Sequence, residues 1–381
     1  MGKFTCPYCY GEHDLSSCRM TCSYNIAGAA SDTCARGVTK DENGWIPQPY
    51  KSKCIKCQEA RKRIFCPAFE VNREIPVSFL DSKSLPIALI GAKASGKSNY
   101  IAVLINEIKK KMTSRFNCSL DICCSEESKR AYDDYYYNPL FRDGEVVQAT
   151  DAATEMPPLI FPLRFMDRKN RIKNVATLTF YDTAGENLDS AESIDIMTRY
   201  IPNAQGIILL LDPLQVGSIR KHLEGKIPLP EINSDVVDVL SRVIQSIRNV
   251  KNIKGTIKIP LALCFTKIDV LEQFGILPEG SCLCEESEHL RLGSFVWSDF
   301  ENTNIEMRDI LANWLDDEIV QMMRQFSSYS IFGLTALGGP PNGSMLAGGG
   351  IKPKRVLDPL LWLLAEHKYI DTVGKRRQNI C

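Results

Sequence analysis

The sequence predicts an α/β protein, in which a mostly parallel sheet is flanked by helices and preceded by a small cysteine-rich domain. Short apolar runs alternate with longer amphipathic segments, the pattern of parallel strands joined by crossover helices. A glycine-rich turn follows the first strong apolar run. Eight of the 15 cysteines lie within the first 66 residues. We therefore expect a cysteine-rich domain over residues 1–80 and an α/β domain with insertions over residues 81–381.

The composition is that of an ordinary globular protein. Hydrophobic residues make up 44% and charged residues 24% of the 381 residues, which is enough apolar material for a sizeable core. Lys+Arg and Asp+Glu both number 46, and this balance argues against a dedicated nucleic-acid binder. No apolar run approaches the ~20 residues that span a bilayer, and no signal peptide is apparent. We expect a cytoplasmic protein whose cysteines are thiols or metal ligands.

The most specific motif is Gly91-Ala-Lys-Ala-Ser-Gly-Lys-Ser98, a complete G-x-x-x-x-G-K-S loop. The apolar run at 85–90 predicts a buried parallel strand before it, and the pattern over 102–112 predicts an amphipathic helix after it. Strand, tight turn and helix N-terminus together form a cradle of backbone N–H groups that suits phosphates. Lys97 would reach the β- and γ-phosphates, and the Ser98 hydroxyl would bind Mg²⁺. The expected nucleotide-binding residues here are Gly91, Lys93, Ala94, Ser95, Gly96, Lys97, Ser98 and Asn99.

A second motif follows a predicted antiparallel hairpin. Apolar runs at 158–166 and 174–182 are separated by a charged turn, which is typical of such a hairpin. The second run ends in Asp182-Thr-Ala-Gly185-Glu186, a D-x-x-G motif at the carboxyl end of a strand, where ligands bind in doubly wound sheets. Asp182 would help to hold Mg²⁺, and the N–H of Gly185 would contact a γ-phosphate.

Two later loops predict recognition of guanine. An apolar strand at 259–265 ends in Thr266-Lys-Ile-Asp269, which resembles the N/T-K-x-D motif. A carboxylate at Asp269 would accept hydrogen bonds from the N1–H and 2-amino groups of guanine, and adenine lacks this pair of donors. Lys267 would pack its stem along the base. After a last strand from 329, Thr335-Ala-Leu337 is a candidate base-contacting loop. The expected base-binding residues are Thr266, Lys267, Asp269, Ala336 and Leu337.

The remaining elements complete the α/β pattern. We expect a strand at 206–212, a helix at 234–250, a loop-like insertion at 270–304, a helix at about 305–326, a mobile Gly/Pro-rich segment at 338–350 and a final apolar helix that begins at Asp358.

The cysteine-rich end predicts structural zinc. Cys6-Pro-Tyr-Cys9 and Cys54-Ile-Lys-Cys57 are two C-x-x-C pairs, and two such pairs can complete a tetrahedral site. The segment lacks the βαβ pattern of a redox domain and has too few aliphatic residues to bury eight free thiols. His13 is a spare candidate ligand, although we expect it to face solvent without binding metal. A second site is open, as is its composition, with candidate ligands Cys18, Cys22, Cys34 and Cys66. Basic residues at 51–63 surround the second pair, and we interpret them as a solvated face rather than a nucleic-acid contact.

The order of these motifs resembles that of Ras-like and translation-factor-like GTPases. The Cys-Pro-Tyr-Cys pair, the phosphate loop and the closing Asp358-Pro-Leu-Leu-Trp-Leu-Leu narrow the resemblance to the double-GTPase family of bacterial conflict systems, which pairs a zinc ribbon with a GTPase domain. The resemblance implies a role in defence. In that family a further C-P-x-C pair usually begins at this position, and Cys66-Pro-Ala-Phe69 lacks the second thiol of the pair.

The resemblance also implies residue roles in GTP hydrolysis. Lys97 and the N–H of Gly185 would stabilise the charge that develops on the phosphate, and Glu186 would orient the attacking water. Lys93 would supply an additional cation or simply face solvent. Thr150 and Thr154 both qualify as the threonine that senses Mg²⁺.

Three functions remain open at this level. The first is a slow GTPase switch, with GTP/GDP, Mg²⁺ and Zn²⁺ as cofactors, that recruits a protein partner and possibly a second GTPase. The second is a housekeeping or trafficking-like G protein. The third is a zinc-dependent nucleic-acid binder gated by GTP.

Overall fold

The computed structural model describes most of the chain from residue 83 onward and shorter pieces before it. The described residues are 4–6, 8–9, 11–14, 17–22, 39–41, 44–46, 61–68, 73–75, 83–91, 95–120, 126–147, 159–180, 200–232, 236–314, 318–346, 348 and 350–375.

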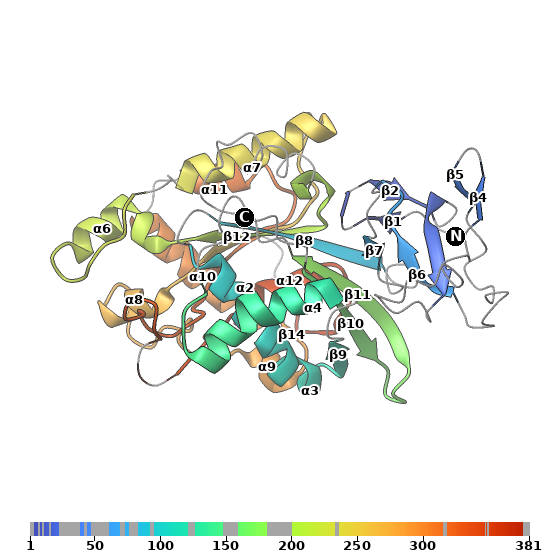
Figure 1. Cartoon of the computed structure of the whole chain (residues 1–381). Helices are drawn as coiled ribbons and strands as arrows, with labels where there is room; N and C mark the ends of the chain where they lie inside the picture. The colour runs from blue at the N-terminus through green and yellow to red at the C-terminus, as the bar shows by residue number, and fades with distance from the viewer. Residues whose placement is uncertain are drawn as a thin grey trace.

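A seven-stranded sheet forms the centre of the molecule (Figure 1), with strand order β15-β13-β12-β8-β11-β10-β9. Neighbours from β15 to β11 pair in parallel, and β10 is antiparallel to both β11 and β9. The predicted parallel sheet and hairpin are therefore confirmed. The strand bounds are β8 Lys83–Gly91, β9 Cys118–Leu120, β10 Leu159–Met166, β11 Ile172–Phe180, β12 Gly206–Leu211, β13 Leu261–Phe265 and β15 Tyr329–Gly333.

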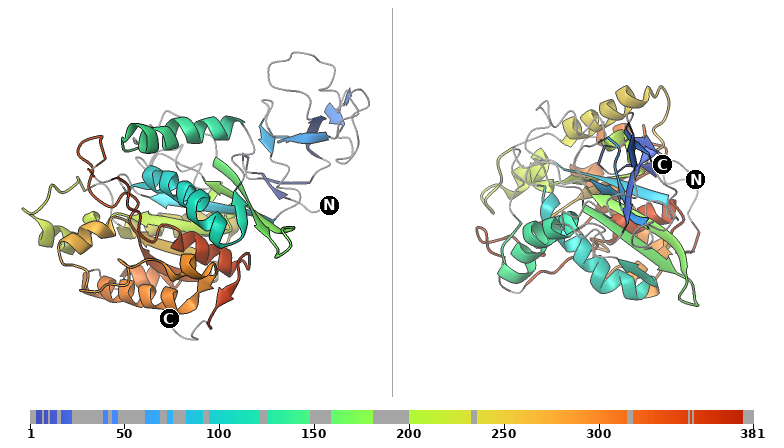
Figure 2. Two further views of the ribbon diagram at one scale, coloured as in Figure 1. Left: turned by 90° about the horizontal axis from the view of Figure 1, so that it is seen from below. Right: turned by 45° about the vertical axis from the view of Figure 1, so that its right-hand side comes forward.

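Apolar side chains alternate between the two faces of this sheet. In β12, Ile208 and Leu210 join the core on one face, and Ile207, Leu209 and Leu211 join the core on the other. Because both faces are covered, the parallel strands read as continuous apolar runs. The two layers of helices are visible in Figures 1 and 2. The first face carries α2 (Lys97–Glu107), the π-helical turn η3 (Ile108–Met112), α4 (Glu126–Tyr132), η4 (Asp133–Tyr137) and α12 (Asp358–Glu366). The second face carries η6 (Ile201–Asn203), α6 (Gly217–Leu223), α7 (Val236–Lys251) and α11 (Glu318–Met323).

The insertion predicted as a loop contains regular structure. It holds α8 (Ile268–Gln273), α9 (Glu288–Leu292) and β14 (Phe295–Val296), which pairs with β16 (Thr372–Val373). The helix expected from residue 305 begins at Trp297 as α10 (Trp297–Trp314), and α11 is separate from it. An aromatic cluster explains the early start, because Phe300 of α10 packs on Phe295, Trp297 and Phe332. Tertiary packing, which the local pattern did not reveal, therefore orders this insertion.

The Gly/Pro-rich segment expected to be mobile also makes specific contacts. The N–H of Val146 donates to the carbonyl of Ser344, and the N–H of Leu346 donates to that of Gly144, each at 2.8 Å. These described residues therefore pair with the turn that precedes residues 148–158.

The N-terminal pieces form a lobe beside the main sheet (Figures 1 and 2). A small apolar cluster joins Cys6, Tyr8, Cys18, Ile64, Cys66 and Ile75 with Ile160 of β10. The lobe thus packs on the edge region of the main sheet through β10. Its strands are β1 Phe4–Thr5, β2 Glu12–His13, β3 Arg19–Cys22, β4 Thr39–Asp41, β5 Gly44–Ile46, β6 Arg61–Phe65 and β7 Glu74–Ile75.

Within the described part of the chain, we find no helix with the length and apolar character required to span a membrane.

Trp362 gives a direct test of this packing. Its side chain is fully buried in α12 and lies 5.8 Å from Phe332, centroid to centroid. We expect Trp362→Ala to lower the free energy of unfolding by about 3–5 kcal/mol, because it empties a large core position. The exposed Val373 supplies the control, because Val373→Ala should change the free energy of unfolding by less than about 0.5 kcal/mol. Urea unfolding measures both, and equal losses would contradict this assignment of the core.

Candidate functional site

The register of the parallel strands brings the predicted motifs to one edge of the sheet. Leu210 of β12 lies opposite Gly91 of β8, and Leu211 lies opposite Phe265 of β13. Phe265 in turn lies opposite Gly333 of β15. The loops that follow these four strands therefore start side by side at the carboxyl edge, which is where open α/β sheets bind ligands.

The phosphate loop begins directly at the end of β8 and leads into α2. Gly96, at the N-cap of α2, has a left-handed backbone with φ 81° and ψ 20°, a conformation that glycine adopts without strain. Lys97 is the first residue of α2 and is 8% exposed. The N–H groups of the first turn thus face the loop as donors for an anion.

Two observations show that the loop suits a phosphate group. A β-carbon built on Gly91 would lie 2.3 Å from the Oγ of Ser95, so any larger residue here would displace the Ser95 hydroxyl from its present position. The Ser95 hydroxyl is buried and finds no hydrogen-bond partner among the described residues. A buried donor of this kind is satisfied when a ligand oxygen occupies the cradle.

Ser98 and Asn99 occupy the first turn of α2. Ser98 is partly exposed, which is compatible with its predicted role as a Mg²⁺ ligand. The side-chain oxygen of Asn99 accepts a hydrogen bond from the N–H of Val147 at 3.0 Å. Asn99 thereby ties the phosphate loop to the chain just before residues 148–158.

The base side of the edge is built around the turn after β13. Thr266 is buried, and its hydroxyl donates to the carbonyl of Leu211 at 3.1 Å. Lys267 has a positive φ of 55° and precedes α8, and its ammonium group pairs with the buried carboxylate of Asp212. Asp212 also accepts from the N–H of Leu214 at 2.9 Å. The Lys267 side chain is therefore anchored to Asp212, the residue directly after β12.

Thr335 fixes the side chain that would read the base. Its hydroxyl donates to the carboxylate of Asp269, and the N–H of Asp269 donates back to the same oxygen at 3.2 Å. Thr335 is fully buried at the end of β15, whereas Asp269 is partly exposed. Ala336 and Leu337, the other predicted residues of this loop, follow Thr335 and are also partly exposed.

The sequence did not single out Asp212, and it named Thr335 only as the first residue of the candidate base-contacting loop. Asp212 anchors Lys267, and Thr335 orients Asp269. A weak signal was present in both cases, because Asp212 directly follows β12 and Thr335 lies two residues after β15, both at the ligand-binding edge.

Several predicted site residues lie outside the described residues. They are Lys93, Ala94, Thr150, Thr154, Asp182, Gly185 and Glu186. The described chain directs Asp182, Gly185 and Glu186 toward this edge from one side, since β11 ends at Phe180 and runs parallel to β8.

A separate cluster of metal-binding groups lies in the N-terminal lobe. Cys6, Cys9, His13 and Cys66 each offer one atom, and these atoms lie within 4.8 Å of one another. The Sγ of Cys9 lies 2.9 Å from the Nε2 of His13 and 3.5 Å from the Sγ of Cys66. A tetrahedron with Zn–S bonds of about 2.3 Å has edges of about 3.8 Å. Both the donor types and their spacing fit zinc.

The pKa shifts of these cysteines also fit a metal-binding site. Hydrogen bonds from Cys6 and Cys66 lower the pKa of Cys9, whereas hydrogen bonds with Cys66 and Cys9 raise the pKa of Cys6. One sulfur is thus favoured as a thiolate while its neighbours keep their protons. A divalent cation would displace those protons, which is how thiol sites couple metal binding to folding.

This cluster differs from the predicted grouping of ligands. Cys6 and Cys9 lie with Cys66, which the sequence analysis had grouped with Cys18. His13 also joins the cluster, so the expectation of a solvent-facing side chain is wrong. The β1–β2 hairpin is the reason, because it pairs Phe4 with His13 and returns the chain beside Cys6. Cys18 is buried nearby within the same apolar cluster. Cys34, Cys54 and Cys57 lie outside the described residues, as does the side chain of Cys22.

Comparison with known proteins places this arrangement in a family. Among solved structures, the chain resembles the small GTPase Arl6 of Trypanosoma brucei, at 13% identity over 76% of this chain and 100% of that one, with a TM-score of 0.30. It also resembles the GTP-bound Ski7 GTPase-like domain of S. cerevisiae, at 15% identity over 75% of this chain and 50% of that one, with a TM-score of 0.34.

A curated relative matches over a greater length. SaeC of Mycolicibacterium smegmatis, a candidate ESX-1 scaffolding and assembly protein, is 25% identical over 336 residues, covering 83% of each chain. The family model described as Double-GTPase 2 matches residues 85–322, more than half of the chain. With its phosphate loop and mostly parallel sheet, the chain belongs to the double-GTPase 2 family.

Proposed function

We propose that this protein binds GTP and GDP together with Mg²⁺, hydrolyses GTP slowly, and acts as a nucleotide-dependent switch for a protein partner. The observation that carries the proposal is the placement of Asp269. Thr335 holds its carboxylate at the same sheet edge as the phosphate loop. A fixed carboxylate acceptor favours guanine over adenine, because only guanine offers the N1–H and 2-amino donors together.

Hydrolysis in this proposal follows in-line attack of water on the γ-phosphate. Lys97 and the backbone N–H groups of the loop would stabilise the charge on the transferred group, and Glu186 would accept a hydrogen bond from the attacking water. Mg²⁺, when bound, would neutralise charge on the phosphate oxygens; Ser98 and Asp182 would hold it, with either Thr150 or Thr154.

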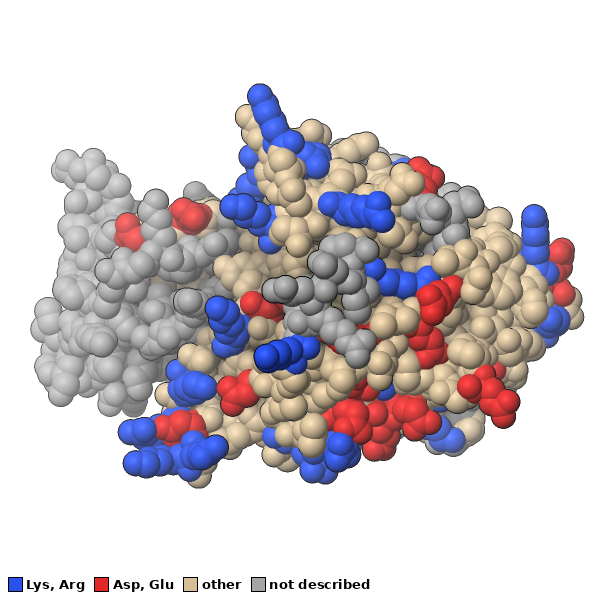
Figure 3. Space-filling view, turned by 180° about the vertical axis from the view of Figure 1, so that it is seen from behind, with Lys and Arg blue, Asp and Glu red and all other residues tan. Residues whose placement is uncertain are grey.

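The relative SaeC supports a role in assembly over a role in defence. SaeC is described as a scaffolding and assembly protein, so we propose that the partner belongs to a protein complex whose assembly depends on the bound nucleotide. A role in defence rests on the family resemblance alone. A nucleic-acid partner finds less support, because basic and acidic side chains both occur on the face drawn in Figure 3.

We further propose a structural Zn²⁺ at Cys6, Cys9, His13 and Cys66. The lobe has a very small apolar cluster of its own, and a metal compensates for such a deficit in small domains. A reducing cytoplasm would suit these thiol ligands. We also propose that the cysteine-rich domain ends near residue 80, where the α/β domain begins.

Replacing Asp269 tests the guanine site. We expect Asp269→Ala to weaken GDP binding by at least about a hundredfold, because two hydrogen bonds to a charged group are lost. Calorimetry with GDP, a GTP analogue and ATP would measure this, and the exposed Asp309 on α10 supplies the control Asp309→Ala. Equal or tighter binding of ATP by the unaltered protein would overturn the assignment to guanine.

Replacing Gly96 tests the phosphate loop separately. A left-handed backbone costs a residue with a side chain roughly 1–2 kcal/mol, so Gly96→Ala should weaken GDP binding about tenfold. The ratio of GDP to ADP affinity should stay constant, because the base site is untouched. Gly217 has open space around it and no positive φ, so Gly217→Ala should bind as the unaltered protein does. A change in the ratio would contradict this separation.

Cys66→Ser tests the metal site. We expect the variant to carry one zinc fewer per chain than the unaltered protein, as measured by elemental analysis after purification without added metal. Cys118→Ser removes a buried thiol outside the cluster and should retain the full metal content. Identical zinc content in all three proteins would show that Cys66 is not a ligand.

A further inference from the structure

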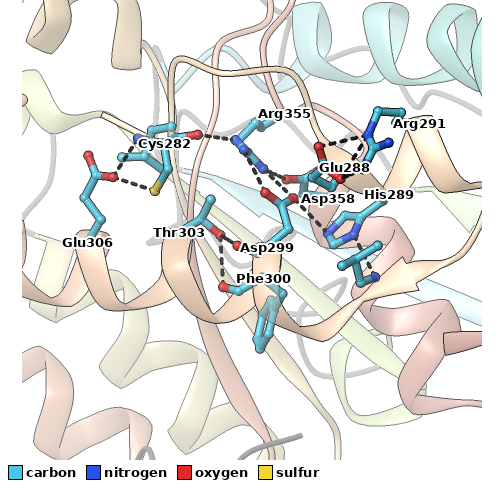
Figure 4. Close-up of polar contacts among 12 residues, drawn as sticks. Cys282, Glu288, His289, Arg291, Asp299, Phe300, Thr303, Glu306, Arg355 and Asp358 are labelled. Carbon is cyan, nitrogen blue, oxygen red and sulfur yellow. Dashed lines mark hydrogen bonds and ion pairs between the residues drawn. The ribbon is translucent and has the colours of Figure 1, made fainter. Parts of the chain in front are cut away.

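A buried charge network lies next to the base-contacting loop without being part of it (Figure 4). The guanidinium of Arg355 donates to the carboxylate of Asp299 at 3.0 and 3.2 Å and to that of Asp358 at 3.0 Å. Its Nε donates to the carbonyl of Cys282 at 2.9 Å. The side chains of Arg355, Asp299 and Asp358 are 2%, 9% and 5% exposed. One side chain therefore joins the insertion, the first turn of α10 and the start of α12.

His289 completes this network from the insertion side. The N–H of Val296 donates to its Nδ1 at 3.0 Å, so Nε2 carries the proton and faces Asp299 at 3.8 Å. Burial lowers the pKa of His289, which favours this neutral form. The carboxylate of Asp299 is thus held from two sides, and a cation is already present between the two acids.

Arg355 is also the last residue of a short segment that covers the base-contacting loop. We call residues 351–355 the strap. Thr335 and Lys354 exchange two backbone hydrogen bonds, each N–H donating to the other residue's carbonyl at 3.0 Å. The N–H of Lys352 also donates to the carbonyl of Leu337 at 2.8 Å. A β-carbon on Gly338 would lie 2.6 Å from the carbonyl oxygen of Lys352. The strap therefore packs directly on the loop that contains Thr335.

The strap is held in a conformation that it would not adopt alone. Arg355 has a positive φ of 52°, which is uncommon for a residue with a long side chain and persists only where surrounding contacts impose it. Just beyond it, the carbonyl of Val356 accepts a hydrogen bond from the hydroxyl of Tyr100, which is fully buried in α2. The strap and the residue directly after it thus contact both the base-contacting loop and α2, the helix that follows the phosphate loop.

We propose that Arg355 is a positioning residue for guanine recognition. It fixes the strap, the strap fixes Thr335, and Thr335 orients the carboxylate of Asp269. Arg355 thus acts on the base-contacting loop through the strap. The inference rests on the proposed guanine site and adds to it a determinant that lies outside the nucleotide-binding motifs.

Comparison of GDP with IDP and ADP tests this role, because inosine lacks the 2-amino group that Asp269 would bind. The unaltered protein should prefer GDP over IDP by about tenfold or more. In Arg355→Lys, the single ammonium cannot reach all three acceptors, so the affinity for GDP should fall about tenfold while that for IDP falls less than about threefold. A merely structural role would lower both affinities equally and leave their ratio unchanged.

Arg291→Lys is the matched control, because Arg291 lies on the same insertion but pairs with Glu288 at the surface, where their side chains are 66% and 40% exposed. Its GDP-to-IDP ratio should equal that of the unaltered protein. Gly338→Ala provides a second variant that loosens the strap at its other end and leaves the charge network intact. It should lower the same ratio even where Arg355→Lys fails to fold.

The outcomes separate the two proposals. A guanine preference in the unaltered protein, with an unchanged GDP-to-IDP ratio in the folded variants, would overturn the role of Arg355 alone. An unaltered protein that does not distinguish GDP from IDP and ADP would overturn the guanine site and the positioning role together. A ratio that falls in Arg355→Lys but not in Arg291→Lys is the expected result; where Arg355→Lys does not fold, a fall in Gly338→Ala is expected in its place.

Discussion

The site depends on the register of the parallel strands. Gly91, Asp212, Thr266 and Thr335 lie at or just after the ends of four different strands, and hydrogen-bonded pairing places these ends at one edge. A slip of one residue in any strand would move its apolar side chains to the wrong face. Because both faces of β12 and β13 are fully buried, such a slip is strongly disfavoured. Burial of the sheet thus holds the nucleotide-binding loops in place.

The base half of the site is supported by several shells of polar contacts. Asp269 is oriented by Thr335, Thr335 is paired with the strap, and the strap ends in a guanidinium buried between two carboxylates. Buried charges are tolerated only where their partners are all present. The network therefore forms only when the insertion, α10 and α12 are docked together, so that completion of the fold and completion of the base site coincide.

The cysteine cluster has a similar relation to the rest of the molecule. Its ligands come from both ends of the lobe, and its apolar neighbours include Ile160 of β10. β10 begins at Leu159, directly after the segment that contains the two candidate threonines for Mg²⁺. A metal bound here would stabilise the part of the lobe that packs on this strand.

The sequence by itself determined the elements whose signals are local. The phosphate loop, the hairpin of β10 and β11, the strand that ends before Thr266 and the final helix all follow from residues that are close to one another in the sequence. Their side-chain periodicity and glycine placement reflect backbone preferences that act over the same short range. The roles of Asp182, Glu186, Thr150 and Thr154 also come from local motifs and remain predictions.

Only the tertiary structure decided which distant residues meet. The partnership of Cys6 and Cys9 with Cys66, the packing of Phe300 on Phe332, and the contact of Arg355 with Asp299 join residues tens of positions apart. Such pairings depend on how the layers pack, and the local pattern contains no signal for them. Asp212 shows the same limit, since its position after a strand was visible but its bond to Lys267 requires that β12 and β13 be neighbours.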